Sequence, residues 1–196
     1  QSKLIAKHYK FFYLDTGKIY RHIGLLRIKY KTKLTYGIIR KNILKLNMKL
    51  LTNNKLLTDE VAISASIVAR DKKVRDIVHK FQQKCAYDPP KKFNGSVLDG
   101  RDITSIQVKD AMFKFFITAS LITRAKRRFE EYRKLKKNIS LNEVLKSIRK
   151  RDKLDRTRKY GPLKKTKDSI LINTTKLSKK ACFMKIKDIM DRKLKA

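Results

Sequence analysis

Apolar residues in the N-terminal part of the chain occur either at helical spacing or in short unbroken runs. Residues 3–8 are typical of the end of a helix, and the run 11–14 predicts a short buried strand that ends at Asp15-Thr16-Gly17. Helical spacing returns over 19–28 and 38–51, so two helices are predicted there.

A longer helix is predicted next, from a cap at Thr58 to about Lys84, because apolar residues keep their helical spacing over this stretch. Asp88-Pro89-Pro90 ends it, since proline cannot continue a helix. The remaining predicted elements are strands over 96–99, 112–118 and 170–172, and helices over 121–133, from a capping box at Ser140 to about Lys150, and after Ser178. The strand over 112–118 is mostly apolar, which is typical of burial on both faces of a parallel sheet.

Alternating helices and strands of this kind predict a layered α/β fold in which the ligand lies at the carboxyl ends of the strands. Three predicted strands end in polar groups, namely Asp15-Thr16-Gly17, Asp99-Gly100-Arg101-Asp102 and Thr118-Ala119-Ser120. We therefore expect these groups to converge at one edge of a sheet.

The composition supports one folded domain spanning 1–196, because 41% hydrophobic residues suffice for a core in a chain of this length. No window holds the roughly 18 uninterrupted apolar residues of a membrane helix, so we expect no membrane association. Cys85 and Cys182 lie far apart, and with three scattered histidines they form neither a metal-binding pattern nor a disulfide framework. These features favour a reducing cytoplasm and no protein-held metal.

The formal charge of +35 would attract nucleic acid by counterion release alone. Most of the excess is lysine spread along the whole chain, which favours solvated surface charge. The segment from Arg149 to Arg158 is different, because it combines six cations with two carboxylates in ten residues. Guanidinium groups bind phosphate in bidentate fashion, so this segment fits either a lid over polyphosphate or an RNA-binding face.

Four motifs in order resemble the bacterial cytidylate kinases and cover essentially the whole chain. They are Leu14-Asp15-Thr16-Gly17-Lys18-Ile19-Tyr20-Arg21, Ala65-Ser66-Ile67-Val68-Ala69 with Arg75 nine residues after the serine, Asp99-Gly100-Arg101-Asp102, and the run from Arg151 to Leu163. The resemblance implies a P-loop nucleoside-monophosphate kinase fold, with a parallel sheet flanked by helices. It also implies transfer of the γ-phosphoryl group of ATP to CMP or dCMP, with Mg²⁺ held through the nucleotide phosphates.

Roles follow from the same match. The resemblance assigns the acceptor phosphate to Arg21, Arg101 and Arg158, cytosine recognition to Ser66, Arg75 and Asp102, and the acceptor sugar and lid to Arg151 and Asp155. It places Asp15, Thr16 and Asp99 in the lining of the pocket, and it suggests Arg124, Arg127, Arg128 and Arg156 for contacts with the ATP phosphates. Residues of about 29–90 form the acceptor-binding helical region and about 149–163 the lid, and the family suggests a monomer. Without the resemblance, Arg75 would be interpreted as a surface partner of Asp71, four residues earlier on a helix.

The sequence departs from the family pattern in three places. It contains no Gly-x-x-Gly-x-Gly-Lys phosphate-binding loop, and aligned on Asp15 the chain begins directly after that motif. We therefore expect a truncated, inactive fragment that lacks its first strand and P-loop. The acceptor-binding insert is shortened, and the turn at 103–109 has lost a glycine and a proline. The alternative hypothesis is a basic nucleic-acid-binding protein on a degenerate kinase scaffold, and another kinase of the same fold differs only in the set Ser66, Arg75 and Asp102.

Overall fold

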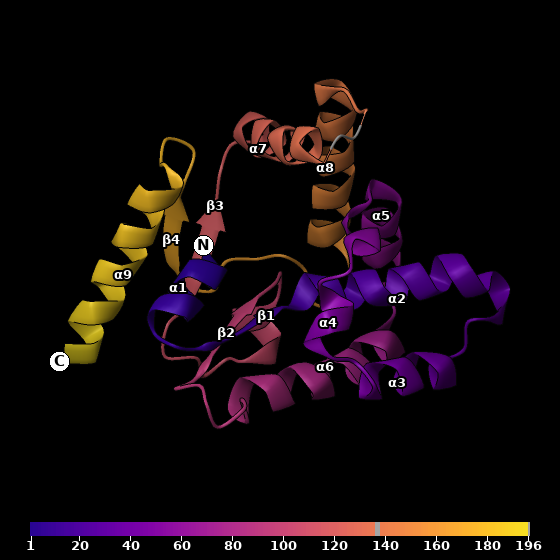
Figure 1. The fold of residues 1–196 in the computed structure, drawn as a ribbon, viewed down its shortest axis with the longest axis horizontal. Coiled ribbons are helices and arrows are strands. Elements are labelled where there is room, and N and C mark those ends of the chain that lie inside the picture. The colour runs from indigo at the N-terminus through magenta and orange to yellow at the C-terminus, as the bar shows by residue number, and fades with distance from the viewer. Residues whose placement is uncertain (136–137, 196) are drawn as a thin grey trace.

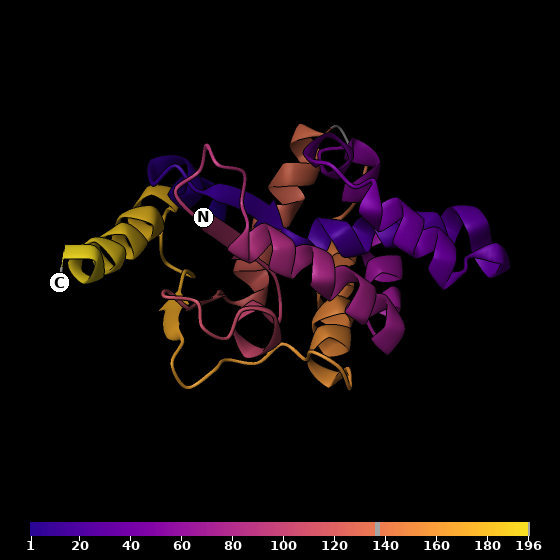
Figure 2. The same ribbon diagram turned by 90° about the horizontal axis from the view of Figure 1, so that it is seen from below.

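The computed structural model describes residues 1–135 and 138–195 of the chain (Figures 1 and 2). Its helices are α1 (Ser2–His8), α2 (Thr16–Tyr30), α3 (Tyr36–Leu44), α4 (Met48–Leu51), α5 (Asp59–Val68), α6 (Lys72–Tyr87), α7 (Leu121–Lys134), α8 (Leu141–Thr157) and α9 (Lys179–Lys195), with short 3₁₀ segments η1 (Lys31–Lys33) and η2 (Asn54–Leu57) and a π-helical turn η3 (Ile103–Gln107). The strands are β1 (Phe12–Asp15), β2 (Ser96–Asp99), β3 (Phe115–Thr118) and β4 (Ile170–Asn173). The protein is therefore a mixed α/β molecule that is mostly helical.

The strands of the described residues form two separate parallel pairs, β1 with β2 and β3 with β4. Parallel pairing is as predicted, but the single sheet expected from the pattern does not form here. The strand predicted over 112–118 begins only at Phe115, and it is not buried on both faces, because Met112 is 64% exposed and Ile117 44% exposed. A pair of four-residue strands has few positions that other elements can cover on both faces. An apolar run in the sequence does not show whether the strand lies in such a small pair or in a large sheet.

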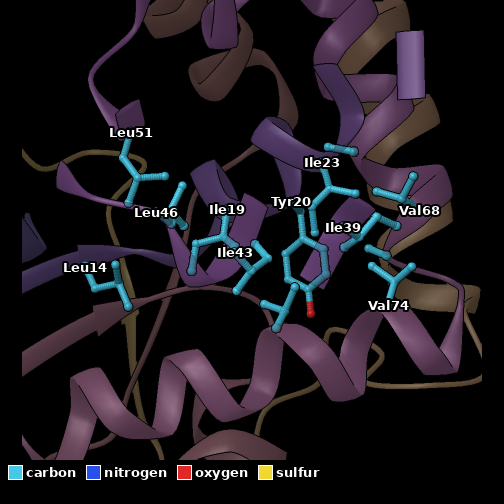
Figure 3. Close-up of a cluster of buried hydrophobic side chains, with 13 residues drawn as sticks. Leu14, Ile19, Tyr20, Ile23, Ile39, Ile43, Leu46, Leu51, Val68 and Val74 are labelled. Atoms are coloured by element: carbon cyan, nitrogen blue, oxygen red, sulfur yellow. The ribbon is translucent and has the colours of Figure 1, made fainter. Parts of the chain in front are cut away.

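The main core lies where α2 packs against α3, α5 and α6 (Figure 3). Its wholly buried members include Leu14, Ile19, Ile23 and Val78. At Gly24 the backbones of α2 and α5 approach so closely that a Cβ atom would lie 2.7 Å from the Ala65 nitrogen. This core fixes α2, α5 and α6 relative to the end of β1, from which α2 starts directly.

Two predicted helices are broken in the structure. The helix predicted from 59 to about 84 divides into α5 and α6, because the Asp71 carboxylate accepts a hydrogen bond from the Val74 N–H and starts a new helix. The helix predicted over 38–51 divides in the same way where Asn47 caps α4. The predicted cap at Thr58 is confirmed, as is the helix end before Asp88-Pro89-Pro90.

The C-terminal part of the chain packs as two further groups. One joins α9, β4 and α1 around Cys182 and Ile186, and in Figure 1 α9 lies beside β4 at the opposite end of the molecule from α3. The other is the α7–α8 pair around Tyr132 and Val144. The predicted capping box at Ser140 is present, but α8 continues to Thr157, beyond the end predicted near Lys150. All of the arginine-rich segment except Arg158, which caps the helix, is therefore helical.

No helix in the described part of the chain is long and apolar enough to cross a membrane. Cys85 and Cys182 are free thiols.

Candidate active site

The carboxyl ends of β1 and β2 bring two aspartates together. Asp15 and Asp99 are register partners in this pair, and the Thr16 hydroxyl donates to the Asp99 carbonyl oxygen over 2.8 Å. Burial and, next, the charge of Asp99 raise the pKa of Asp15. The third predicted strand end lies in the other strand pair, where Ser120 caps α7 by accepting from the Thr123 N–H. Only two of the three strand ends therefore meet in one pair.

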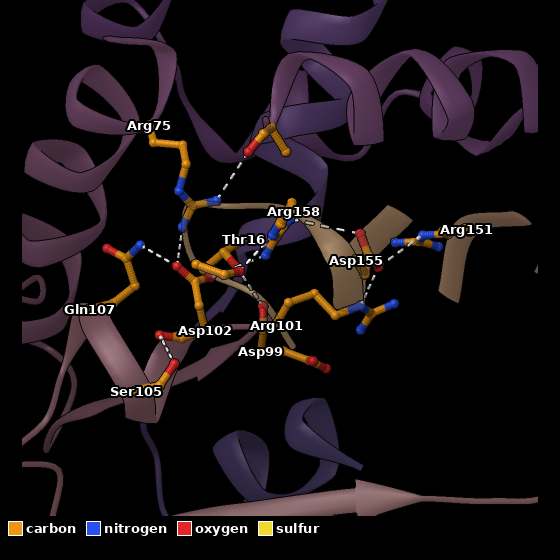
Figure 4. A network of polar contacts seen from close by, with 12 residues as sticks. Thr16, Arg75, Asp99, Arg101, Asp102, Ser105, Gln107, Arg151, Asp155 and Arg158 are labelled. Carbon is orange, nitrogen blue, oxygen red and sulfur yellow. Dashed lines mark hydrogen bonds and ion pairs between the residues drawn. The ribbon is translucent and has the colours of Figure 1, made fainter. Parts of the chain in front are cut away.

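A buried ion pair lies beside these strand ends. Arg75 Nη2 donates to Asp102 Oδ2, and both side chains are almost completely enclosed (Figure 4). Arg75 Nη1 also reaches the Ala69 carbonyl oxygen at 3.4 Å, and its guanidinium lies 5.7 Å from the Tyr20 ring centroid. The alternative pairing of Arg75 with Asp71 is wrong, because Asp71 caps α6 and Arg75 points inward.

A second carboxylate, Asp155 on α8, is surrounded by arginines. Arg101 Nε donates to it over 2.9 Å, while Arg158 and Arg151 lie at ion-pair distances of 3.7 and 3.8 Å. Arg158 also faces Asp102 Oδ1 at 3.9 Å, so it links the two buried carboxylates. Residues from the predicted lid and from the strand ends thus form one polar network.

The lid segment closes over the buried pair at Gly161. The Gly161 carbonyl accepts from Arg158 Nε over 2.5 Å, and its φ of +60° lies in the region that favours glycine. A side chain at this position would collide with the Arg75 guanidinium and with Asp102. The loop after α8 therefore covers the Arg75–Asp102 pair.

In this network the charge of one arginine contributes to lowering the pKa of a neighbouring arginine. Burial and, next, repulsion by Arg101 lower the pKa of Arg151 to about 10, and its Nε is enclosed without a hydrogen-bond partner among the described residues. Burial followed by the charge of Arg75 lowers the pKa of Arg158, and burial followed by Arg128 lowers that of Arg21. Cations held this close favour an anion between them.

Arg21 and Arg128 bind the end of η2. Arg21 Nη1 donates to the Leu56 carbonyl over 2.6 Å, and Arg128 Nη2 donates to that of Leu57 over 3.1 Å. Arg21 makes no ion pair with a carboxylate among the described residues, although its charge acts on Arg151. Ser66 is buried on α5, one turn before the Ala69 carbonyl that accepts from Arg75.

The other arginines suggested for ATP differ in their environments. Arg124 forms an ion pair of 2.8 Å with Asp152, whereas Arg127 donates to Thr174 and to the Leu177 carbonyl and so joins α7 to the loop between β4 and α9. Arg156 is exposed near the end of α8. Of these three arginines, Arg127 therefore has a structural role.

Sequence reasoning missed Gln107. Its side chain is 2% exposed and donates to Asp102 Oδ2 over 2.8 Å. A polar residue between Ile106 and Val108 was the available signal, because glutamine in an apolar run needs a buried partner. The Tyr20 hydroxyl is buried without a hydrogen-bond partner within the described chain, and this burial raises its pKa to about 12.

Comparison with known proteins gives one consistent answer. The family model described as cytidylate kinase matches residues 1–192. The chain belongs to the cytidylate kinase family. Similar proteins include the cytidylate kinases of Clostridium botulinum strain Langeland (35% identity over 97% of this chain and 91% of the relative) and Bacillus pumilus (34%, 97% and 89%). That of Bartonella bacilliformis is 34% identical over the whole chain and 89% of the relative.

As a cytidylate kinase the chain is a phosphotransferase by family, and membership implies the P-loop kinase fold and the use of ATP. The resemblance inferred from the four motifs is thereby confirmed at the level of the family. The network of arginines beside two buried carboxylates in this chain is chemically suited to a phosphorylated substrate.

Proposed function

We propose that this chain holds the acceptor site of a kinase that transfers the γ-phosphoryl group of ATP to CMP or dCMP, and that these 196 residues, which contain no phosphate-binding loop, bind the acceptor without catalysing the transfer. A phosphate oxygen of the acceptor forms a new bond to the γ-phosphorus, and the bond between that phosphorus and the β–γ bridging oxygen breaks. ADP leaves with the bridging oxygen, and CDP or dCDP is the other product. The observation that carries the proposal is the buried Arg75–Asp102 pair next to the arginines gathered around Asp155.

The acceptor phosphate is assigned to Arg21, Arg101 and Arg158. Arg101 and Arg158 contact Asp155, and a phosphate dianion offers the same guanidinium groups more acceptors and more charge. Arg151 and Asp155 would then face the sugar. Phosphoryl transfer through a loose transition state needs positioning and charge neutralisation, which arginines supply without a protein nucleophile.

Base recognition is assigned to Ser66, Arg75 and Asp102. The exocyclic amino group of cytosine can donate to the Asp102 carboxylate, and its ring carbonyl can accept from Arg75. Uracil presents a carbonyl oxygen where cytosine has the amino group, so that oxygen would face a carboxylate. A buried polar site of this kind rejects such an analogue strongly, because the hydrogen bond to Asp102 is lost and the two facing oxygens repel each other.

Asp15 and Asp99 are suited to a Mg²⁺ ion that is held mainly by nucleotide phosphates. Mg²⁺ commonly takes one or two carboxylates in addition to phosphate oxygens and water. The raised pKa of Asp15 reflects, after burial, the charge of Asp99, and a cation between them would relieve that repulsion. When bound, the ion would neutralise charge on the transferring phosphoryl group.

Binding of a base requires the loop at 158–163 to move, since Gly161 lies against the recognition pair. We assign this loop, with the last turns of α8, to a lid of about residues 149–163. The helices of about 29–90, which include Ser66 and Arg75, would hold the acceptor. These boundaries, and a monomeric state, remain proposals.

The test is acceptor binding by calorimetry, which needs only residues that this chain holds. We expect saturable binding of CMP, with UMP and AMP at least about ten-fold weaker, and loss of CMP binding in Asp102→Ala. Asp102→Asn should also shift preference toward UMP, because an amide can donate to the uracil carbonyl. Asp168→Ala is the matched control, since Asp168 is an exposed carboxylate that pairs with Lys114.

Absence of any preference for CMP would refute the proposal. If a short RNA then binds instead, with affinity that falls steeply between two salt concentrations, the chain is a basic nucleic-acid-binding protein.

A further inference from the structure

Gln107 reaches the base-recognition carboxylate by an unusual local fold. Asp102 starts the π-helical turn η3, in which its carbonyl accepts from the N–H groups of Ile106 (2.9 Å) and Gln107 (3.2 Å). This turn brings the Gln107 side chain back to the carboxylate five residues earlier, where Nε2 donates to Asp102 Oδ2. Figure 4 shows Gln107 and Arg75 approaching Asp102 from different sides.

The two oxygens of Asp102 are used unequally. Oδ2 accepts from both Arg75 and Gln107, whereas Oδ1 makes no hydrogen bond within the described chain and faces Arg158 only at 3.9 Å. Two donors from different elements hold the carboxylate in one orientation, and the oxygen that remains free is an acceptor for a ligand donor.

The environment of Gln107 indicates what the amide contributes. Because a carboxylate only accepts, the amide must present its nitrogen to Asp102, and this turns Oε1 the other way. Oε1 is buried without a partner among the described residues, which is unfavourable. An apolar side chain of the same length would avoid that unpaired oxygen, so the hydrogen bond to Asp102 is the property that glutamine supplies here.

We propose that Gln107 is a positioning residue that sets the selectivity for cytosine over uracil. It holds Asp102 Oδ2, so that Oδ1 is directed toward the exocyclic amino group of the base. Gln107 acts through Asp102, and the inference rests on the proposed role of Asp102 in base recognition. Arg75 alone would leave the carboxylate free to rotate and to offer either oxygen.

The experiment compares Gln107→Met with Gln82→Met. Methionine keeps the length of glutamine and removes the donor. Gln82, on α6, is also wholly buried but has no hydrogen bond among the described residues, so it controls for loss of a buried amide. We expect the ratio of the UMP to the CMP dissociation constant to fall about ten-fold in Gln107→Met, with UMP binding unchanged. Gln82→Met should keep the wild-type ratio.

If Gln107 had only a structural role, its substitution would weaken the binding of CMP and UMP equally and leave the ratio of their dissociation constants unchanged. That result would overturn the inference. The proposed function is judged separately, on the wild type and on Asp102→Ala. If those two behave as expected and Gln107→Met keeps its ratio, only the role of Gln107 fails.

A measurement on the wild type covers the case in which Gln107→Met does not fold. The chain has only four glutamines, so ¹⁵N labelling of their side-chain amides gives a simple NMR spectrum. Gln82 and Gln107 should give two enclosed amide signals that exchange slowly with water, and Gln82→Met identifies the first of them. We expect the other signal to shift when CMP binds and to shift less with UMP. The inference is overturned if no side-chain amide signal shifts when CMP is added.

Discussion

Burial gives the charged residues of this protein their distinct roles. Arg75, Asp102, Asp155 and Arg158 are each at most 6% exposed in a chain whose charges lie mostly on the surface. A buried charge must be paired or hydrogen-bonded, because its desolvation is otherwise costly. These four residues therefore depend on one another, and an arriving nucleotide must replace the contacts that it breaks.

Asp15 makes the stability of the protein depend on pH. Its pKa is raised above the ordinary value of 3.8 by burial and by Asp99, so the folded chain binds its proton more tightly than the unfolded chain. The contribution of Asp15 is thus favourable below that value and is lost as the pH rises through the raised pKa. We expect Asp15→Asn to raise the melting temperature at pH 7 and to lose this gain in acid below about pH 4.

Asp168→Asn is the control of opposite sign. The hydrogen bond from Lys114 lowers the pKa of Asp168, so the folded state favours its ionised form. Its replacement should lower the melting temperature at pH 7 rather than raise it. An Asp15→Asn variant that is less stable than wild type at neutral pH would contradict the prediction.

The break between α5 and α6 determines where Arg75 points. In one continuous helix Asp71 would be an ordinary helical position one turn before Arg75. In the structure Asp71 starts α6, and its carboxylate also accepts from the Tyr36 hydroxyl of α3 over 2.7 Å. A single aspartate thus begins α6 and ties it to α3.

Asp71→Ala should lower the free energy of unfolding by about 1 kcal/mol, because the cap of α6 is lost. It should also weaken CMP binding, since Arg75 lies in the first turn of that helix. Urea unfolding and calorimetry measure the two effects. Thr58→Ala is the control, because it removes the N-terminal cap of α5, the helix that precedes α6. Equal effects of both variants on CMP binding would show that Asp71 has no special influence on Arg75.

The whole molecule carries a charge of +35, and only part of it is concentrated in the site. General surface charge is screened by any salt, whereas clustered guanidinium groups bind an oxyanion directly. The charges of Arg101, Arg21 and Arg128, which lie on several elements, all lower the pKa of Arg151 in addition to its burial. We therefore expect two separable effects of added salt, namely general screening of the surface charge and direct binding of an oxyanion to the clustered arginines.

Phosphate should raise the melting temperature more than chloride at equal ionic strength. At ten times its dissociation constant, a ligand of the folded state contributes about 1.4 kcal/mol, which is about 3–6 °C for a chain of this size. Differential scanning fluorimetry measures the increment. Arg101→Gln should reduce it, whereas Arg133→Gln should not, because Arg133 is an exposed partner of Glu130. An increment that is the same in both variants would place the phosphate elsewhere.

The sequence by itself determined the features that depend on near neighbours. The strand at 96–99, the capping box at Ser140 and the end of α6 before two prolines were predicted correctly, because caps and apolar spacing act within a few residues. The order of four motifs was also sufficient for the family.

Only the tertiary structure decided which distant groups meet. Arg75 pairs with Asp102 across 27 residues rather than with Asp71 on its own side of the helix. Asp102 also receives Gln107, and the strands form two pairs instead of one sheet. These outcomes depend on how helices and loops pack against one another. That packing determines which partner a buried charge finds, and the partner determines the free energy of burying the charge.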